Sequence, residues 1–418
     1  MLKRLFARPL LWWITGIVLQ VCFPLQRLSL WLLLPVTLVI LHSVCIARRQ
    51  ATFSYSGRWV SGAVFACLLV FLSIQMTALT EIRLSRPSER GWLEQKARET
   101  QKYMVEKLDP LRLSDDEKAV LATITVNYRL AMSRELRRQF STIGMSHLLS
   151  ISGFHVAIVG GFLVFLFSFF RRRKLFIFLR YIVLITAIWV YTYICGLAAP
   201  AVRAAIMFSI YLTGNTLKLR LDKYNTLAMA AFFMLWYNPF YLFEVGFQLS
   251  YIGTFSIMYL QPRIYQLIHV RNPLLAYPWD VLTVTMAAQA GTIPLCSYYF
   301  GKTSVICLLT NVYLSFLSIL LIPLALLWML LPVGLPGSEA LQWAIEVLTR
   351  SLMWLVNRFS MVPGAQVSMD FDFVTTLGVY GIFILWMYYS RVRSKWMLFS
   401  ALLLLLFLLC RQLIGVFA

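Results

Sequence analysis

Charged residues are scarce in this chain, at 13% of 418 residues, whereas hydrophobic residues make up 60%. Soluble domains average about 25% charged and 45–50% apolar residues, so both departures exclude an ordinary water-soluble globular protein. At about 20 apolar residues per span, the length accommodates about 10–12 spanning helices and one short soluble insertion. We therefore predict an all-α, polytopic helical integral membrane protein.

Motifs for nucleotides, cofactors and metals are also missing. The sequence has no GxxxxGK[ST] phosphate loop, no GxGxxG after a strand, no HExxH and no CxxC pair. Its seven cysteines all lie in apolar runs, where free cysteine commonly behaves as a small buried hydrophobe. We predict no metal, no cofactor and no enzymatic activity, so driven transport would take its energy from another protein.

The basic residues indicate how the chain crosses the membrane. The net charge is +21, with 38 Lys and Arg against 17 Asp and Glu, but residues 80–145 are nearly balanced. Because basic loops stay cytoplasmic, the N-terminus and the 47–60 loop are predicted inside and the 80–145 insertion outside. The basic, apolar N-terminus has no cleavage site after it and is read as an anchor in the inner membrane.

Periodicity divides the chain into four parts. We expect N-terminal membrane helices in 1–79, a helical extracytoplasmic insertion in 80–145, a transmembrane channel domain in 146–390 and a C-terminal membrane helix in 391–418. In the insertion, Ser114 and Glu117 form a capping box that starts a helix. The expected spans are 10–23, 28–46, 61–79, 146–170, 175–195, 200–216, 224–238 and 240–261.

Beyond residue 275 the number of crossings is ambiguous. The run 280–297 is interrupted by Gly291-Thr292-Ile293-Pro294, and 341–361 is amphipathic, so one of the two is expected not to cross. Irregular backbone at membrane depth requires protein or water around it. The interruption at 291–294 therefore suggests an aqueous path.

The string GMSHLLSISGFHVAIVGGF (144–162) combines small and polar residues where the insertion meets the membrane. Gly153, Ala157 and Gly161 recur every four residues, which favours close helix packing. The polar residues favour either a wet, pore-lining vestibule or hydrogen bonds to nearby backbone; they are Ser146, His147, Ser150, Ser152 and His155. Zinc is disfavoured because His147 and His155 lie about 80° apart on a helix. Ser152 and His155 could form a nucleophile pair, but no acid follows to orient the imidazole.

Other polar residues occur within apolar runs. Arg203 follows Pro200 at a helix start, where a guanidinium beside converging amides favours a bound phosphate or a lipid headgroup. Glu244 and Gln248 at i, i+4 could pair with Arg203 or serve a substrate path. Gln289 and Asn311 could bond another helix or face a pore. Asp222 is expected to cap a helix.

Four ordered blocks within about 120–320 resemble the ComEC family of competence membrane channels. They are TVNYRLAMSRELRRQFSTIGMSHLLSISGFHV, GLAAPAVRAAIM, LDKYNTLAMAAFFMLWYNPFYLFEVGFQLSY and AQAGTIPLCSYYFGKTSVICLLTN. The resemblance implies an inner-membrane protein that passes single-stranded DNA into the cytoplasm during natural transformation. Its motifs fall on Ser146, His147, Ser152, Gly153 and His155, on Arg203, and on Gly246, Gln248 and Ser250.

The chain departs from that family in three ways. It has no oligonucleotide-binding insertion before the first block, no C-terminal metallo-β-lactamase-like domain, and Asn127 where glycine is usual. The resemblance then implies a separate DNA receptor, a separate nuclease and a cytoplasmic ATPase as partners, besides membrane lipids. The chain could also form a homo-oligomer. The alternative is a ComEC-like transporter of a small solute or lipid without a competence role.

Overall fold

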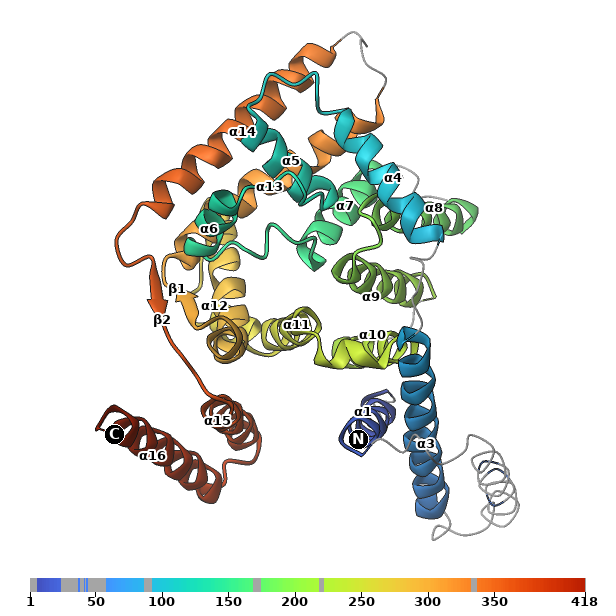
Figure 1. Ribbon diagram of the computed structural model, residues 1–418, viewed down its shortest axis with the longest axis vertical. Coiled ribbons are helices and arrows are strands. Elements are labelled where there is room, and N and C mark those ends of the chain that lie inside the picture. The colour runs from blue at the N-terminus through green and yellow to red at the C-terminus, as the bar shows by residue number, and fades with distance from the viewer. Residues whose placement is uncertain are drawn as a thin grey trace. The chain divides into compact units, whose positions relative to one another are not determined.

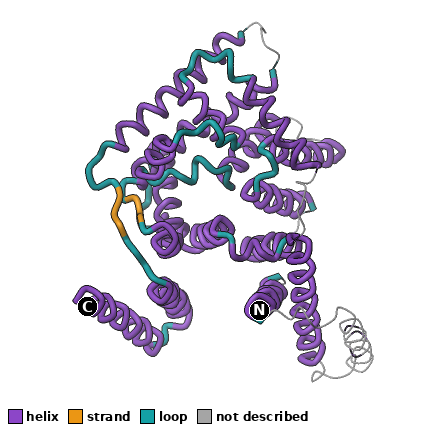
Figure 2. Tube along the Cα trace, viewed as in Figure 1, coloured by secondary structure: helices purple, strands orange, loops and turns teal. Residues whose placement is uncertain are grey.

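Helices form nearly all of the regular structure in the computed structural model of this chain (Figures 1 and 2). The structure describes residues 6–23, 37, 41, 43, 58–85, 92–167, 174–217, 222–331 and 337–417. Within them lie fifteen α-helices, the 3-10 helix η3 and two short strands, which confirms the all-α class. The span expected at 28–46 lies almost wholly outside the described residues.

Three helices among the described residues are long and apolar enough to cross a membrane. They are Gly62–Arg83, Cys307–Leu330 and Phe373–Ser390. Four shorter apolar helices, of 10–17 residues, accompany them: Ala7–Cys22, Gly153–Leu166, Phe178–Ile194 and Lys395–Leu408. The expected total of about 10–12 crossings stays a prediction.

The chain is organised in two units, each assembled from three stretches of sequence. The first contains 1–131, 148–248 and 319–346, and the second contains 132–147, 249–318 and 347–418.

Close packing joins the N-terminal helices of the first unit. Helix α1 (Ala7–Cys22) packs on α3 (Arg58–Ser85), where a Cβ on Gly16 would lie 2.4 Å from the Val70 carbonyl oxygen. The Ser73 hydroxyl donates to the Trp13 carbonyl at 2.6 Å. The Trp13 ring stacks on Trp236 of α10 (Lys223–Tyr237), with centroids 4.9 Å apart. The missing side chain at Gly16 and the stacked Trp13 ring therefore hold α1 closely against α3 and α10.

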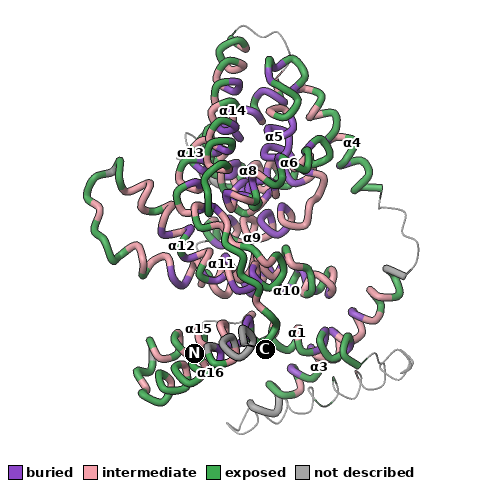
Figure 3. Tube along the Cα trace, turned by 60° about the vertical axis from the view of Figure 1, so that its left-hand side comes forward, coloured by how far each residue is buried: buried purple, intermediate pink, exposed green. Residues whose placement is uncertain are grey.

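The insertion is helical, as expected. Helix α4 (Trp92–Glu106) is followed by α5 (Asp115–Val126), which starts at the predicted Ser114–Glu117 capping box. All residues of α5 from 119 to 126 are buried (Figure 3). Gln101 donates to the Val126 carbonyl at 2.6 Å. Because α5 is enclosed on every side from 119 to 126, this part of the helix is the core of the insertion.

Asn127 ends α5 in the left-handed conformation, with φ of 62°. Glycine adopts this conformation without strain, and asparagine is among the few other residues that tolerate it. The departure from the family pattern at this position therefore preserves the turn.

Helix α7 (Gly153–Leu166) is shorter than the predicted 146–170 span, because Ser152 caps it and 146–152 forms turns and loop. The expected packing face is also wrong: Gly153, Ala157 and Gly161 are exposed. Close approach occurs instead at Gly160, where a Cβ would lie 2.7 Å from the Phe208 ring of α9 (Ala199–Thr216). The bulky Phe208 ring therefore packs against the face of α7 that carries Gly160, where no side chain is in the way.

In the second unit, α12 (Pro273–Phe300) runs without a break through 291–294, which corrects the predicted interruption. Proline removes one backbone donor, and neighbouring helices can satisfy the freed carbonyls. The Tyr380 hydroxyl, on α15 (Phe373–Val392), donates to the Gly291 carbonyl at 2.8 Å. Gly291 also packs on Ser256 of α11 (Val245–Tyr265). The 291–294 segment is therefore a packing site and no longer indicates an aqueous path.

Two short antiparallel strands connect loops of this unit (Figure 2). Strand β1 (Lys302–Ser304) pairs with β2 (Gln366–Ser368), with Thr303 opposite Val367. The ribbon follows Gly301, which ends α12 with a positive φ of 62°. It places the start of α13 (Cys307–Leu330) next to the segment that leads into α15.

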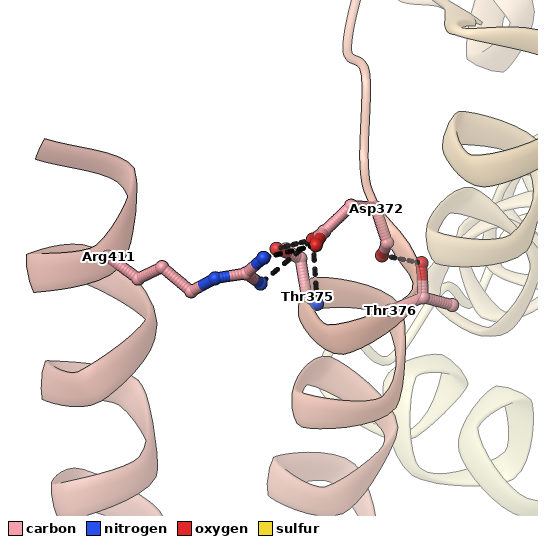
Figure 4. Close-up of polar contacts among 4 residues, drawn as sticks. All are labelled: Asp372, Thr375, Thr376 and Arg411. Carbon is pink, nitrogen blue, oxygen red and sulfur yellow. Dashed lines mark hydrogen bonds and ion pairs between the residues drawn. The ribbon is translucent and has the colours of Figure 1, made fainter. Parts of the chain in front are cut away.

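Helices α15 and α16 (Lys395–Phe417) form a C-terminal hairpin in which Gly378 faces Leu408. Asp372 caps α15 by accepting from the Thr375 amide at 3.0 Å, and the Arg411 guanidinium binds the same carboxylate (Figure 4). Arg411 and Thr375 together hold the pKa of Asp372 well below its usual range. The ion pair between Asp372 and Arg411 therefore joins the start of α15 to the C-terminal part of α16.

Replacing Asp372 with Asn should weaken this hairpin, because the amide keeps the cap but loses the ionic partner of Arg411. The depressed pKa means that the stabilisation is present at neutral pH and is lost as the pH falls below about 4 towards that pKa. Limited proteolysis between pH 7 and pH 3 measures this. The double variant with Arg411→Gln should be no weaker than either single variant; additive losses would contradict the pairing.

Candidate functional site

A row of polar side chains joins α12 and α13 within the second unit. On α12, Thr285 and Gln289 are four residues apart, and on α13 Cys307, Asn311 and Ser315 repeat the same spacing. The Asn311 amide donates to the Thr285 hydroxyl and accepts from Ser315, and the Gln289 amide donates to the Cys307 sulfur. We call these five residues the α12–α13 seam.

The loop before α7 is fixed against the start of α13. The Thr310 hydroxyl donates to the Ile143 carbonyl at 3.0 Å. Gly144 has φ of 75°, and a Cβ there would lie 2.4 Å from the Cys307 Cβ. Both the positive φ and the close approach require glycine at this position.

His147 meets the seam from this loop. Its ring hydrogen-bonds with the Gly144 backbone and the Asn311 side chain, while part of the side chain remains exposed. The surrounding chain displaces water, and this lowers the pKa of His147 although those hydrogen bonds oppose the effect. The ring is therefore neutral at pH 7 and can both donate and accept hydrogen bonds.

The contacts in the seam show what surrounds two of the predicted site residues. Gln289 and Asn311 each bond the facing helix, which is one of the two alternatives that the sequence left open. Gln289 and Asn311 are both partly buried between the two helices, whereas His147, which lies beside Asn311, is exposed to solvent. Whether these groups line a substrate path stays a prediction.

In the first unit, Ser152 and His155 form a reciprocal cap on α7. The Ser152 hydroxyl accepts from the Phe154 amide at 3.3 Å, and the His155 Nδ1 lies 3.1 Å from that hydroxyl oxygen. His155 also accepts from the Ser152 amide at 3.3 Å and is fully buried. Histidine thus occupies the position that glutamate takes in an ordinary capping box. The predicted i, i+3 contact exists, and it serves the helix start.

Arg203 is the fifth residue of α9, one position further into the helix than a start at Pro200 would place it, and Pro200 is in the first turn. The side chain is 4% exposed, and its Nη2 donates to the Gly246 carbonyl of α11 at 3.1 Å. The guanidinium also lies 6.0 Å from the centre of the Phe247 ring. Arg203 therefore points inward to another helix, away from a lipid headgroup.

Glu244 and Gln248 do not share a helix face, which corrects the prediction for 240–261. Residues 239–243 form η3 (Pro239–Phe243), Glu244 is extended and exposed, and α11 begins at Val245. The Gln248 amide donates back to the Leu242 carbonyl at 3.0 Å. Proline at the start of the segment favours the tight 3-10 turn, which ends before a regular helix can begin.

Within the described ranges, no group of three His, Cys, Asp or Glu side chains is placed to hold a metal ion. The absence of an enzymatic role stays a prediction.

The structure joins blocks that are distant in sequence. His147 of the first block meets Asn311 of the fourth, and Arg203 of the second block meets Gly246 of the third. Sequence reasoning missed Thr285, Cys307 and Ser315. Their signal was the four-residue spacing of polar side chains within apolar helices.

Comparison with known proteins gives two findings. The family model described as Competence protein matches residues 124–394. The ComE operon protein 3 of Bacillus subtilis (strain 168) is 31% identical over 196 residues, which are 46% of this chain and 24% of that protein. This chain thus aligns with about a quarter of the relative's length. No solved structure matches the chain.

Proposed function

Because the chain belongs to the ComEC family of competence proteins, we propose that it is a membrane channel or permease for single-stranded DNA in natural transformation. The observation that carries this proposal is the family match over 124–394, which contains the seam, His147, His155 and Arg203. The small-solute or lipid carrier is not favoured by these findings. The chain is a membrane protein.

The chemistry of the described residues supports the proposal. A strand that crosses a membrane needs hydrated polar groups along its course, since each phosphate is charged. The seam is a row of polar groups bonded to one another between α12 and α13, and it meets the exposed His147 at one end. In this proposal the strand passes along the seam, and its groups exchange these bonds for contacts with water and phosphate. In this proposal the chain is not an enzyme, and a separate receptor, nuclease and ATPase capture, trim and pull the DNA. The N-terminus lies in the cytoplasm.

Deleting the gene in a transformable host should abolish entry of labelled DNA into the cytoplasm. DNA held at the cell surface should persist, because a separate receptor captures it. The measurement is nuclease-protected label in spheroplasts, with the wild-type gene restored as the control. Undiminished entry in the deletion strain would discard the proposal.

Variants of the seam sharpen this test. Asn311→Leu removes the partner of both His147 and Thr285 and should reduce DNA entry strongly at equal protein level. Asn357→Leu makes the same change at an exposed position on α14 (Ser338–Ser360) and should leave entry unchanged. Equal uptake in the two variants would remove the seam from the path.

A further inference from the structure

Helix α14 presents aromatic and cationic side chains on one exposed face. Trp343 and Trp354 are 67% and 58% exposed, and Arg350 and Arg358 are exposed beside them. The opposite face is buried and apolar, and the acidic Glu346 also turns inward, where it accepts from the Arg112 amide at 2.8 Å. The exposed face is therefore positively charged and rich in aromatic rings.

A groove of about 480 Å³ lies between this face and α13. Its α13 side consists of Tyr313, Phe316 and Leu317, and its α14 side of Arg350, Ser351, Trp354 and Leu355. All seven residues belong to the second unit. The groove thus combines apolar walls with one guanidinium, and its volume falls within the range of about 300–1,000 Å³ for small-molecule sites.

The surroundings of the groove favour a lipid. Helix α13 is a candidate span, and its Tyr313 and Phe316 are about half exposed, so these rings would face acyl chains in a bilayer. Trp, Tyr and Arg are the side chains that gather where acyl chains meet headgroups. A single-stranded nucleic acid would instead need a hydrated, multiply charged surface, whereas five of the seven wall residues are aromatic or aliphatic and only Arg350 is charged.

We propose that this groove binds one anionic phospholipid. The Arg350 guanidinium contacts the headgroup phosphate, since its planar fork of donors matches phosphate oxygens. Phe316, Leu317 and Leu355 pack against the upper part of an acyl chain, with the Trp354 and Tyr313 rings at the rim. The bound lipid fills the space between α13 and α14. This inference does not depend on whether the chain transports DNA.

The test is native mass spectrometry of the delipidated full chain in mild detergent. It compares phosphatidylglycerol with phosphatidylcholine of the same acyl chains. We expect one saturable phosphatidylglycerol site, weakened about tenfold by Arg350→Gln because a charge-assisted hydrogen bond is lost. Arg358→Gln is the matched control, since Arg358 is exposed on the same helix and does not itself line the groove; because its guanidinium lies 5.8 Å from the centre of the Trp354 ring, this variant should lose affinity far less than Arg350→Gln.

A second variant tests the apolar wall. Leu317→Trp fills the groove and leaves Arg350 in place, so it should also abolish the saturable site, with folding checked by size-exclusion chromatography. Equal binding of both lipids, or equal weakening by Arg350→Gln and Arg358→Gln, would overturn the proposal. Binding of inorganic phosphate or an oligothymidine with the same Arg350 dependence, and no phosphatidylglycerol site, would also overturn it.

Discussion

Replacing Gly291 with alanine is expected to destabilise the protein strongly, although alanine is the better helix former. A Cβ at this position would lie 1.9 Å from the Ser256 hydroxyl oxygen and 2.7 Å from its Cβ. The hydroxyl can rotate away, but the Cβ can move only with the α11 backbone. Overpacking of this kind costs about 1–3 kcal/mol. Thermal unfolding of the solubilised protein, followed by fluorescence-detected size exclusion, should show the lower midpoint.

A matched control and a rescue separate packing from helix propensity. Gly153→Ala makes the same change where no atom lies within 4 Å of the added Cβ, so its midpoint should not fall. Ser256→Gly removes both clashing atoms, and the double variant with Gly291→Ala should recover most of the loss. Failure of this rescue would show that the α11–α12 contact does not set the cost.

Local chemistry could be predicted from the sequence. The Ser114–Glu117 box and the Asp222 cap depend on residues within one turn of each other, and both occur; Asp222 accepts from the Tyr224 and Asn225 amides. Helices such as α8 (Lys174–Ile194) and α9 follow directly from apolar runs of sufficient length.

Predictions that needed a partner from elsewhere in the chain were less successful. The stripe of Gly153, Ala157 and Gly161 satisfied the spacing rule for close packing, but the Phe208 ring on α9 approaches Gly160 instead. Gly291 and Pro294 have the composition of a break, and the contacts from Tyr380 and Ser256 that keep α12 continuous come from distant segments. Spacing along one helix does not reveal which neighbour it meets.

The candidate site shows the same contrast between residues that the sequence reveals and contacts that it does not. Its residue types were apparent because polar groups are rare in this chain, but their pairing was not. His147 with Asn311, and Arg203 with Gly246, bring together residues 164 and 43 positions apart. Polar groups buried among apolar helices must find partners, so each of these pairs couples the positions of two helices.

Arg203→Glu should therefore have the other large effect. The substitution reverses a buried charge and sets a carboxylate against the Gly246 carbonyl oxygen, which Arg203 now satisfies. Leaving a buried charge without its partner costs about 3–5 kcal/mol. We expect little folded protein in the membrane and no DNA entry, measured by immunoblot of membrane fractions and by nuclease-protected label. Arg134→Glu, the same reversal at an exposed helix start, should alter neither.

Arg203→Lys distinguishes a structural role from a role in the path. Lysine keeps the positive charge but lacks the planar fork of donors, so it can satisfy the Gly246 carbonyl less well. If Arg203 acts by holding the first turn of α11, protein level and DNA entry should fall together in this variant. A normal protein level with lost entry would place the guanidinium itself on the path of the strand. Wild-type behaviour of Arg203→Glu would exclude both roles, because neither the contact with Gly246 nor the charge could then matter.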